Sequence, residues 1–184
     1  MAWQQAADAL PPGTAPHWTL VFRKSRIGPN AFALPDGTIV MTDDLVKLVD
    51  SDTQVLTAVL AHELGHVEHR DGLRMLVQVA VLGSISSMLL GDFSTVLAAA
   101  PALLGQAQYS REAEHQADVY SLRVLKAAHI APSSMVTLFD KLAEQRSHGK
   151  TRTDEKPEES LLGIAFASHP TDADRIAFFK QAQP

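Results

Sequence analysis

Extended hydrophobic patterns come first along the chain, and helical patterns follow. In residues 17–25, β-branched and aromatic side chains lie between turn signals, which predicts a strand. Residues 27–42 contain two short extended runs around a Pro-Asp-Gly turn, so we expect a hairpin or an edge strand there. A short helix is predicted over residues 43–51.

A longer helix is predicted over residues 52–72. Its apolar positions repeat at helical spacing, and Ser51 with Gln54 three residues later resembles a capping box. Gly72 is expected to end this helix. Further helices are predicted over residues 110–129, from Pro132 to about Gln145, and after the N-cap Thr171.

Strands that precede a series of helices predict an α+β fold in which helices dominate. The 184 residues are enough for one domain with a sizeable core, and no internal repeat is present. We therefore expect a single domain over residues 1–184, with an N-terminal lead-in over 1–16 and a mobile, polar loop over 147–160.

Two uncharged runs, over residues 76–91 and 93–110, interrupt the helical pattern. They are about 16 and 18 residues long, at or below the ~20 residues that a membrane-spanning helix needs. Polar residues and Pro101 divide them. The runs fit a buried helical hairpin, and the alternative is a surface that faces a membrane or a partner.

Composition and charge exclude several classes of protein. The net charge is −5 and Lys and Arg form no stripe, so we expect no nucleic-acid partner. The absence of cysteine excludes disulfides, thiolate metal sites and cysteine nucleophiles. The first ten residues do not resemble a signal peptide, and a leader or an anchor upstream stays open.

The His-Glu-Leu-Gly-His sequence at residues 62–66 lies within the longest predicted helix. His62 and His66 are four residues apart, so they lie on one face, one turn apart, and can share a zinc ion. Glu63 is rotated about 100° around the helix and can act as a general base without ligating the metal. The alternative is that both histidines belong to an ordinary buried core.

A catalytic zinc ion usually has three protein ligands, and an acidic residue on a later helix can supply the third. Glu112 and Glu114 are both candidates. Glu114 has Asp118 one turn further on the same face, where a carboxylate can orient a ligand histidine, whereas Glu112 has Gln116 there. We therefore predict Glu114 as the third ligand and Asp118 as the orienting carboxylate. The alternative for these acidic residues is a solvated helix face.

Four motifs occur in order between residues 17 and 180. They are Asn-Ala-Phe at 30–32, His-Glu-Leu-Gly-His at 62–66, Ser-Arg-x-x-Glu-x-x-Ala-Asp at 110–118, and His169-Pro170 with Arg175 six residues after the histidine. Together they resemble the gluzincin metallopeptidases that include the CAAX prenyl endopeptidase, the HtpX heat-shock protease, the mitochondrial Oma-type protease and the periplasmic BepA-type protease.

The resemblance implies a zincin-like domain with a small N-terminal sheet or hairpin, an H-E-x-x-H active-site helix and one zinc ion per chain. Further, it implies that Asn30, Ala31 and Phe32 lie on an edge strand that binds substrate. It also implies catalytic roles for His169, which could stabilise an oxyanion, and for Arg175, which supports the same corner of the site.

The function predicted from these residues is that of a zinc-dependent endopeptidase acting on protein or peptide substrates, with a role in protein quality control implied by the resemblance. The same resemblance implies a periplasmic or membrane-associated location, with a membrane surface or an anchor outside this chain as a partner. Two alternatives stay open. One is a latent, chaperone-like or scaffold domain whose metal is blocked by His148 or His169. The other is an interaction module whose apolar segment binds lipid or a partner.

Overall fold

The computed structural model describes residues 8, 17–24, 28–90, 109–150, 169 and 173–182. Strands β1 (Thr19–Arg23), β2 (Ala31–Ala33) and β3 (Thr38–Thr42) form one sheet in the order β1-β3-β2. Strand β1 runs parallel to β3, and β2 runs antiparallel to it. The predicted hairpin is confirmed, and among the described residues β2 lies at an edge of the sheet.

The turn between β2 and β3 requires its glycine. Gly37 has φ +85°, a left-handed conformation that favours glycine. A Cβ atom there would also collide with the carbonyl oxygen of His17. The Pro-Asp-Gly signal therefore has a direct steric cause.

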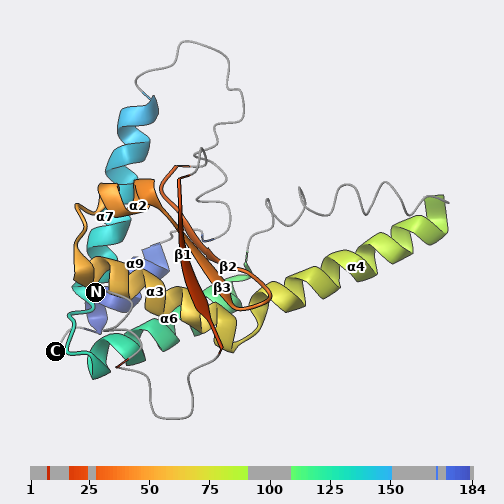
Figure 1. The fold of residues 1–184 in the computed structure, drawn as a ribbon, viewed down its shortest axis with the longest axis horizontal. Coiled ribbons are helices and arrows are strands. Elements are labelled where there is room, and N and C mark those ends of the chain that lie inside the picture. Colours follow the sequence, from red (N-terminus) through yellow and green to blue (C-terminus); the bar gives the residue numbers. More distant parts are fainter. Residues whose placement is uncertain are drawn as a thin grey trace.

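Helices make up most of the described chain and confirm the predicted α+β class. Their bounds are α2 (Asp43–Leu48), α3 (Thr53–Glu68), α4 (Asp71–Leu90), α6 (Arg111–Ala127), α7 (Ser133–Lys150) and α9 (Ala173–Gln181). Helix α3 passes beside the sheet, and α6 lies along α3 (Figure 1). Every residue of α3 from Val55 to His66 is buried.

Several predicted helix ends are corrected. The N-cap of α3 is Asp52 rather than Ser51, because the Asp52 carboxylate accepts hydrogen bonds from the backbone N–H groups of Gln54 and Val55. Ser51 itself has a left-handed backbone, with φ 59°. Helix α3 ends at Glu68, so Gly72 lies in the first turn of α4.

Helix α7 is longer than predicted. It continues to Lys150, so residues 147–150 of the predicted loop are helical, whereas residues 151–160 lie outside the described part of the chain. The predicted N-cap Thr171 and the lead-in, apart from residue 8, also lie outside it.

Helix α4 projects away from the rest of the molecule (Figure 1). Its first turn is held, since Asp71 is buried and Gly72 approaches Pro35. From Leu73 onward, four apolar side chains are 38–53% exposed: Leu73, Leu76, Val77 and Val81. Leu76, Val77 and Val81 belong to the uncharged run over residues 76–91, so its predicted burial is wrong for these three side chains, because the helix leaves the core after one turn. Most of the other run, residues 93–108, lies outside the described part of the chain. Within the described ranges, no helix is both long and apolar enough to cross a membrane.

Candidate metal centre

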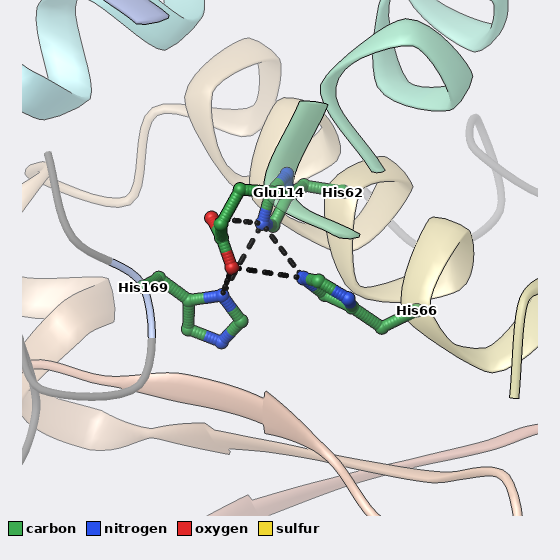
Figure 2. Close-up of side chains that lie close together, drawn as sticks. All are labelled: His62, His66, Glu114 and His169. Atoms are coloured by element: carbon green, nitrogen blue, oxygen red, sulfur yellow. Dashed lines mark hydrogen bonds and ion pairs between the residues drawn. The ribbon is translucent and has the colours of Figure 1, made fainter. Parts of the chain in front are cut away.

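Three predicted ligands and one further histidine converge where α3 meets α6. His62 and His66 project from α3, Glu114 projects from the first turn of α6, and His169 approaches from the other side (Figure 2). One nitrogen or oxygen atom from each of the four side chains lies within 4.8 Å of the corresponding atoms of the others. His62, His66 and Glu114 are almost fully buried.

The spacing of these atoms fits a zinc ion. The Nε2 atoms of His62 and His66 are 3.2 Å apart. Glu114 places Oε1 3.4 Å from His66 Nε2 and Oε2 3.5 Å from His62 Nε2. His169 Nδ1 lies 3.3 Å from His62 Nε2 and 2.9 Å from Glu114 Oε1. Ligand atoms at ~2.0–2.1 Å from a tetrahedral zinc ion lie about 3.3 Å from one another, so all four positions are compatible with its ligands.

Aspartates fix the orientation of both helix histidines. Asp118 Oδ1 is 2.9 Å from His62 Nδ1, and Asp71 Oδ2 is 2.9 Å from His66 Nδ1. A carboxylate accepts hydrogen bonds, so each Nδ1 donates and each neutral ring turns its Nε2 lone pair into the cluster. The two Nε2 atoms then face each other as acceptors at 3.2 Å, beside the Glu114 carboxylate, and a cation between them removes the mismatch.

Arg175 on α9 links Glu114 and Asp118, two of the three acidic residues of α6. Its guanidinium donates two hydrogen bonds of 2.7 Å to Asp118, one to each carboxylate oxygen, and its Nη1 lies 2.6 Å from Glu114 Oε2. Arg175 is only 7% exposed, so the pair is shielded from solvent. Its contacts hold together Glu114, a predicted ligand, and Asp118, which bonds to His62.

The electrostatics of the cluster favour bound positive charge. Burial alone would lower the pKa of His62, but hydrogen bonds to Asp118 and Glu114 outweigh burial and raise it to about 9. Burial likewise opposes ionisation of Glu114 and Asp118, yet the surrounding histidines hold the pKa of Glu114 below its usual range, and His62 with Arg175 does the same for Asp118. Surroundings that hold a proton on a buried histidine also favour a metal cation.

The close approach of α3 and α6 depends on Gly65, between the two ligand histidines. A Cβ atom at Gly65 would lie 2.8 Å from Cα and 3.1 Å from the carbonyl oxygen of Ala117 on α6. Ser121, one turn further, donates a hydrogen bond of 3.1 Å to the carbonyl of Ala58. The absent side chain at Gly65 thus lets the α6 backbone approach closely enough for Glu114 to reach the histidines.

Glu63 lies beside the cluster without joining it. It is 2% exposed, its Oε1 is 3.5 Å from His169 Nε2, and its Oε2 has no hydrogen-bond partner among the described residues. An unpartnered buried carboxylate oxygen is costly unless a water molecule or a substrate pairs with it. This position next to a metal cluster suits a general base.

Sequence reasoning missed two residues that hold His66. Asp71 bonds to its Nδ1, and the ring of Tyr109 stacks on it with centroids 4.1 Å apart and planes at 13°. Burial, aided by nearby carboxylates, raises the pKa of Tyr109 above its usual range, so the phenol stays protonated. Only their positions in the sequence could have indicated these two residues. Asp71 follows His66 by five residues, and Tyr109 directly precedes the Ser-Arg motif.

The predicted substrate strand lies next to the site. Asn30 and Ala31 line a pocket that also includes His62 and Glu63, while Phe32 does not contribute to that pocket. The backbone N–H of Asn30 donates a hydrogen bond of 2.8 Å to the Thr42 hydroxyl, and the carbonyl of Asn30 accepts one of 2.9 Å from the Thr42 N–H. All predicted site residues except Phe32 therefore surround the metal cluster or its adjoining pocket.

Comparisons with known proteins agree with this geometry. The chain is 31% identical over 160 residues to Metalloprotease LoiP of Escherichia coli (strain K12), an alignment that covers 79% of this chain and 55% of LoiP. It is 30% identical over 161 residues to the Beta-barrel assembly-enhancing protease of the same organism, covering 80% of this chain and 31% of that protein. The Mitochondrial metalloendopeptidase OMA1 of Arabidopsis thaliana is 30% identical over 157 residues, covering 83% of this chain and 29% of OMA1.

These relatives are longer proteins, and the chain spans about half of the first and less than a third of the other two. The predicted zinc cofactor agrees with both the metalloprotease relatives and the His-His-Glu-His cluster. The profile of the family described as Peptidase family M48 matches residues 3–183, almost the whole sequence. The chain therefore belongs to peptidase family M48.

Proposed function

We propose that the chain is a zinc endopeptidase of the gluzincin type, which hydrolyses peptide bonds of protein substrates in protein quality control. The observation that carries this proposal is the cluster of four possible ligand atoms beside Glu63, whose Oε2 has no hydrogen-bond partner among the described residues. His62, His66 and Glu114 would hold the zinc ion. When bound, zinc supplies a Lewis acid that lowers the pKa of water and polarises the scissile carbonyl.

The chain's own residues carry the proton transfer. Glu63 takes a proton from the attacking water through Oε2 and returns it to the leaving amine. His169 Nε2, which lies 3.5 Å from Glu63 Oε1 and has no hydrogen-bond partner among the described residues, would donate a hydrogen bond to the oxyanion. Arg175 and Asp118 keep Glu114 and His62 in place, and an extended substrate would add to the edge of β2.

Zinc content and casein cleavage, measured on four versions of the chain, test these roles. We expect one zinc per chain in the wild type and in Glu63→Gln, with cleavage by Glu63→Gln at least ~10²-fold slower because its general base is lost. Glu114→Ala should lose zinc and activity together. Glu112→Ala is the matched control: Glu112 is the exposed alternative ligand, bonded to Gln116, and its loss should change neither. Full activity in Glu63→Gln would remove Glu63 as the base.

A latent site is the second candidate, since His169 Nδ1 occupies the fourth corner of the cluster. A catalytic zinc site keeps that position for water or substrate, whereas four protein ligands close it. The variant His169→Ala separates the two cases. If His169 stabilises the oxyanion, the variant is slower than the wild type; if His169 blocks the metal, the wild type is inactive and the variant gains cleavage.

We also propose a periplasmic or membrane-associated location. The exposed apolar side chains of α4 support it, because a row of such side chains on a projecting helix suits a lipid surface or a partner protein. If the chain is instead purely an interaction module, it should bind lipid or a partner protein without cleaving protein. The zinc and casein measurements therefore distinguish this module from a peptidase.

A further inference from the structure

We propose that a small pocket between β2, α3 and α7 binds one aliphatic side chain of the substrate, at the residue directly beside the bond that is cut. The inference rests on the proposed endopeptidase function and adds to it the class of side chain that the site selects. The pocket has a volume of about 60 Å³.

The pocket has a polar end and an apolar end. At the polar end are His62, Glu63, His169 and Arg175, all from the candidate site. The apolar end is formed by Leu45 of α2, Val59 of α3 and four side chains of α7: Met135, Leu138, Phe139 and Leu142. The pocket is therefore lined both by the candidate reacting groups and by hydrocarbon side chains.

The polar end lacks partners for two buried atoms. Within the described ranges, neither Oε2 of Glu63 nor Nε2 of His169 has a hydrogen-bond partner. One is an acceptor, and the other is a donor when Nδ1 faces a metal ion. A peptide group offers both a donor and an acceptor, so a peptide next to these atoms would satisfy them.

The edge strand determines how a peptide enters. Strand β2 pairs with β3 on one side; its first residue Ala31 and the preceding Asn30 line the pocket. A peptide added in extended form along β2 turns successive side chains to opposite faces. One side chain then points into the pocket while its own peptide group lies at Glu63.

Size and polarity select the side chain. A cavity of roughly 150 Å³ lined by Leu, Ile and Phe admits benzene, so 60 Å³ leaves room for about two to four carbon atoms. Val, Leu and Ile fit this space, whereas Phe and Trp exceed it. The apolar end offers no hydrogen-bonding or charged partner among its described side chains, so Asp or Lys would be buried at a high desolvation cost.

A series of quenched fluorescent peptides tests the selection. Each peptide contains one cleavable bond, and the residue on either side of it is varied through Ala, Val, Leu, Phe, Trp, Asp and Lys. At one of the two positions we expect kcat/KM with Val or Leu to exceed that with Phe, Trp, Asp or Lys by roughly 10- to 100-fold. Equal rates for all residues at both positions would overturn the proposal.

A variant with a larger pocket tests whether the side chains that line the pocket cause the preference for aliphatic residues. Leu142→Ala should admit Phe and reduce the Leu-to-Phe ratio about tenfold. Leu56→Ala is the matched control, because Leu56 is 8% exposed where Leu142 is 9%, belongs to the same hydrophobic cluster and does not line the pocket. It should keep the wild-type ratio. An unchanged ratio in Leu142→Ala, or an equal change in Leu56→Ala, would contradict the pocket.

A binding measurement separates this inference from the proposed function. In the zinc-loaded variant Glu63→Gln, fluorescence anisotropy of labelled peptides reports affinity without turnover, and the Val and Leu peptides should bind most tightly. Cleavage by the wild type without any such preference would contradict the proposed role of the pocket but not the proposed endopeptidase activity. Preferential binding of aliphatic peptides with no cleavage by the wild type would support the proposed role of the pocket and contradict the proposed endopeptidase activity.

Discussion

Each nitrogen of His66 has its own contact in the site. Nδ1 bonds to Asp71, and Nε2 faces His62 and Glu114. Tyr109 covers one face of the ring, so it has little freedom to rotate. A ligand held in this way loses less conformational freedom on binding a metal, and the loss of its orienting partner should weaken binding.

We predict that Asp71→Asn binds zinc roughly 10- to 100-fold more weakly than the wild type. An amide at this position can turn its NH₂ toward Nδ1, which removes the constraint on the tautomer. Isothermal titration with zinc measures the change. Asp43→Asn is the control, because Asp43 also lies in the first turn of a helix but contacts no predicted ligand. Equal affinities in both variants would show that Asp71 does not position His66.

At the scale of single residues, the sequence predicted the contacts that depend on local spacing along the chain. His62 and His66 share a face because they are four residues apart on one helix, and this follows from helical geometry alone. Asp71 lies beyond the end of α3, where Arg70 has a left-handed backbone with φ 55° that turns the chain back. That turn brings Asp71 to His66, and no periodic pattern predicts it.

Between elements, the packing of α3 on α6 brings the third ligand to the other two. Gly65 has no side chain at the point where the two backbones are closest. The sequence showed a glycine within the metal motif, but it did not show which segment would pack there.

We predict that Gly65→Ala destabilises the chain and weakens zinc binding. Overpacking a core costs about 1–3 kcal/mol, and the better helix propensity of alanine returns at most ~1 kcal/mol. The neighbours of the new Cβ are backbone atoms of Ala117, which cannot rotate away. Urea unfolding of the metal-free protein and zinc titration measure the two effects.

Gly72→Ala is the matched control, since Gly72 is also helical but its added Cβ would meet Pro35 and Ala33 at 3.4–3.6 Å, an ordinary contact distance. That variant should be unchanged or up to ~1 kcal/mol more stable, because it gains only helix propensity. A Gly65→Ala protein as stable as Gly72→Ala would contradict the close-packing argument.

Over the whole molecule, a metal ion in the cluster would join α3, α6 and the segment that carries His169. A ligand that binds only the folded state stabilises it, by about 4 kcal/mol when it is present at 1,000 times its Kd. For a chain of this size we predict that removing zinc with a chelator lowers Tm by roughly 8–16 °C. Differential scanning fluorimetry with zinc or with chelator measures this.

The variant His62→Ala provides the control for that experiment. It lacks one ligand, so its Tm should respond weakly to zinc or to the chelator. A wild-type Tm that does not change on chelation would mean that the cluster does not hold a metal in the folded protein.

The projecting helix α4 leads to a prediction about surfaces. If its exposed apolar side chains contact lipid, the chain should float with uncharged phosphatidylcholine vesicles, and Val77→Glu/Val81→Glu should float less. Phe22→Glu/Val119→Glu adds the same charge at exposed apolar positions of β1 and α6 and serves as the control. No flotation of the wild type, or equal loss in both variants, would argue against α4 as a lipid-binding element.

The sequence by itself determined what depends on neighbouring residues. It predicted the two strands around a glycine turn, the helical face of His62 and His66, and the helix that carries Glu114 and Asp118, because the geometry of a turn or a helix follows from local spacing. Motifs in a fixed order also identified His169 and Arg175, although local geometry does not place either residue near the cluster.

Only the tertiary structure decided which distant groups meet. The hydrogen bonds from Arg175 to Asp118, the contact of Asp71 with His66 and the pocket between β2 and α7 depend on how elements pack. The exposure of α4 also depends on packing, since an uncharged sequence suits a buried helix as well as a projecting one. The pattern of side chains along the sequence reflects the local backbone conformation, whereas contacts between elements depend on the shape of the whole core.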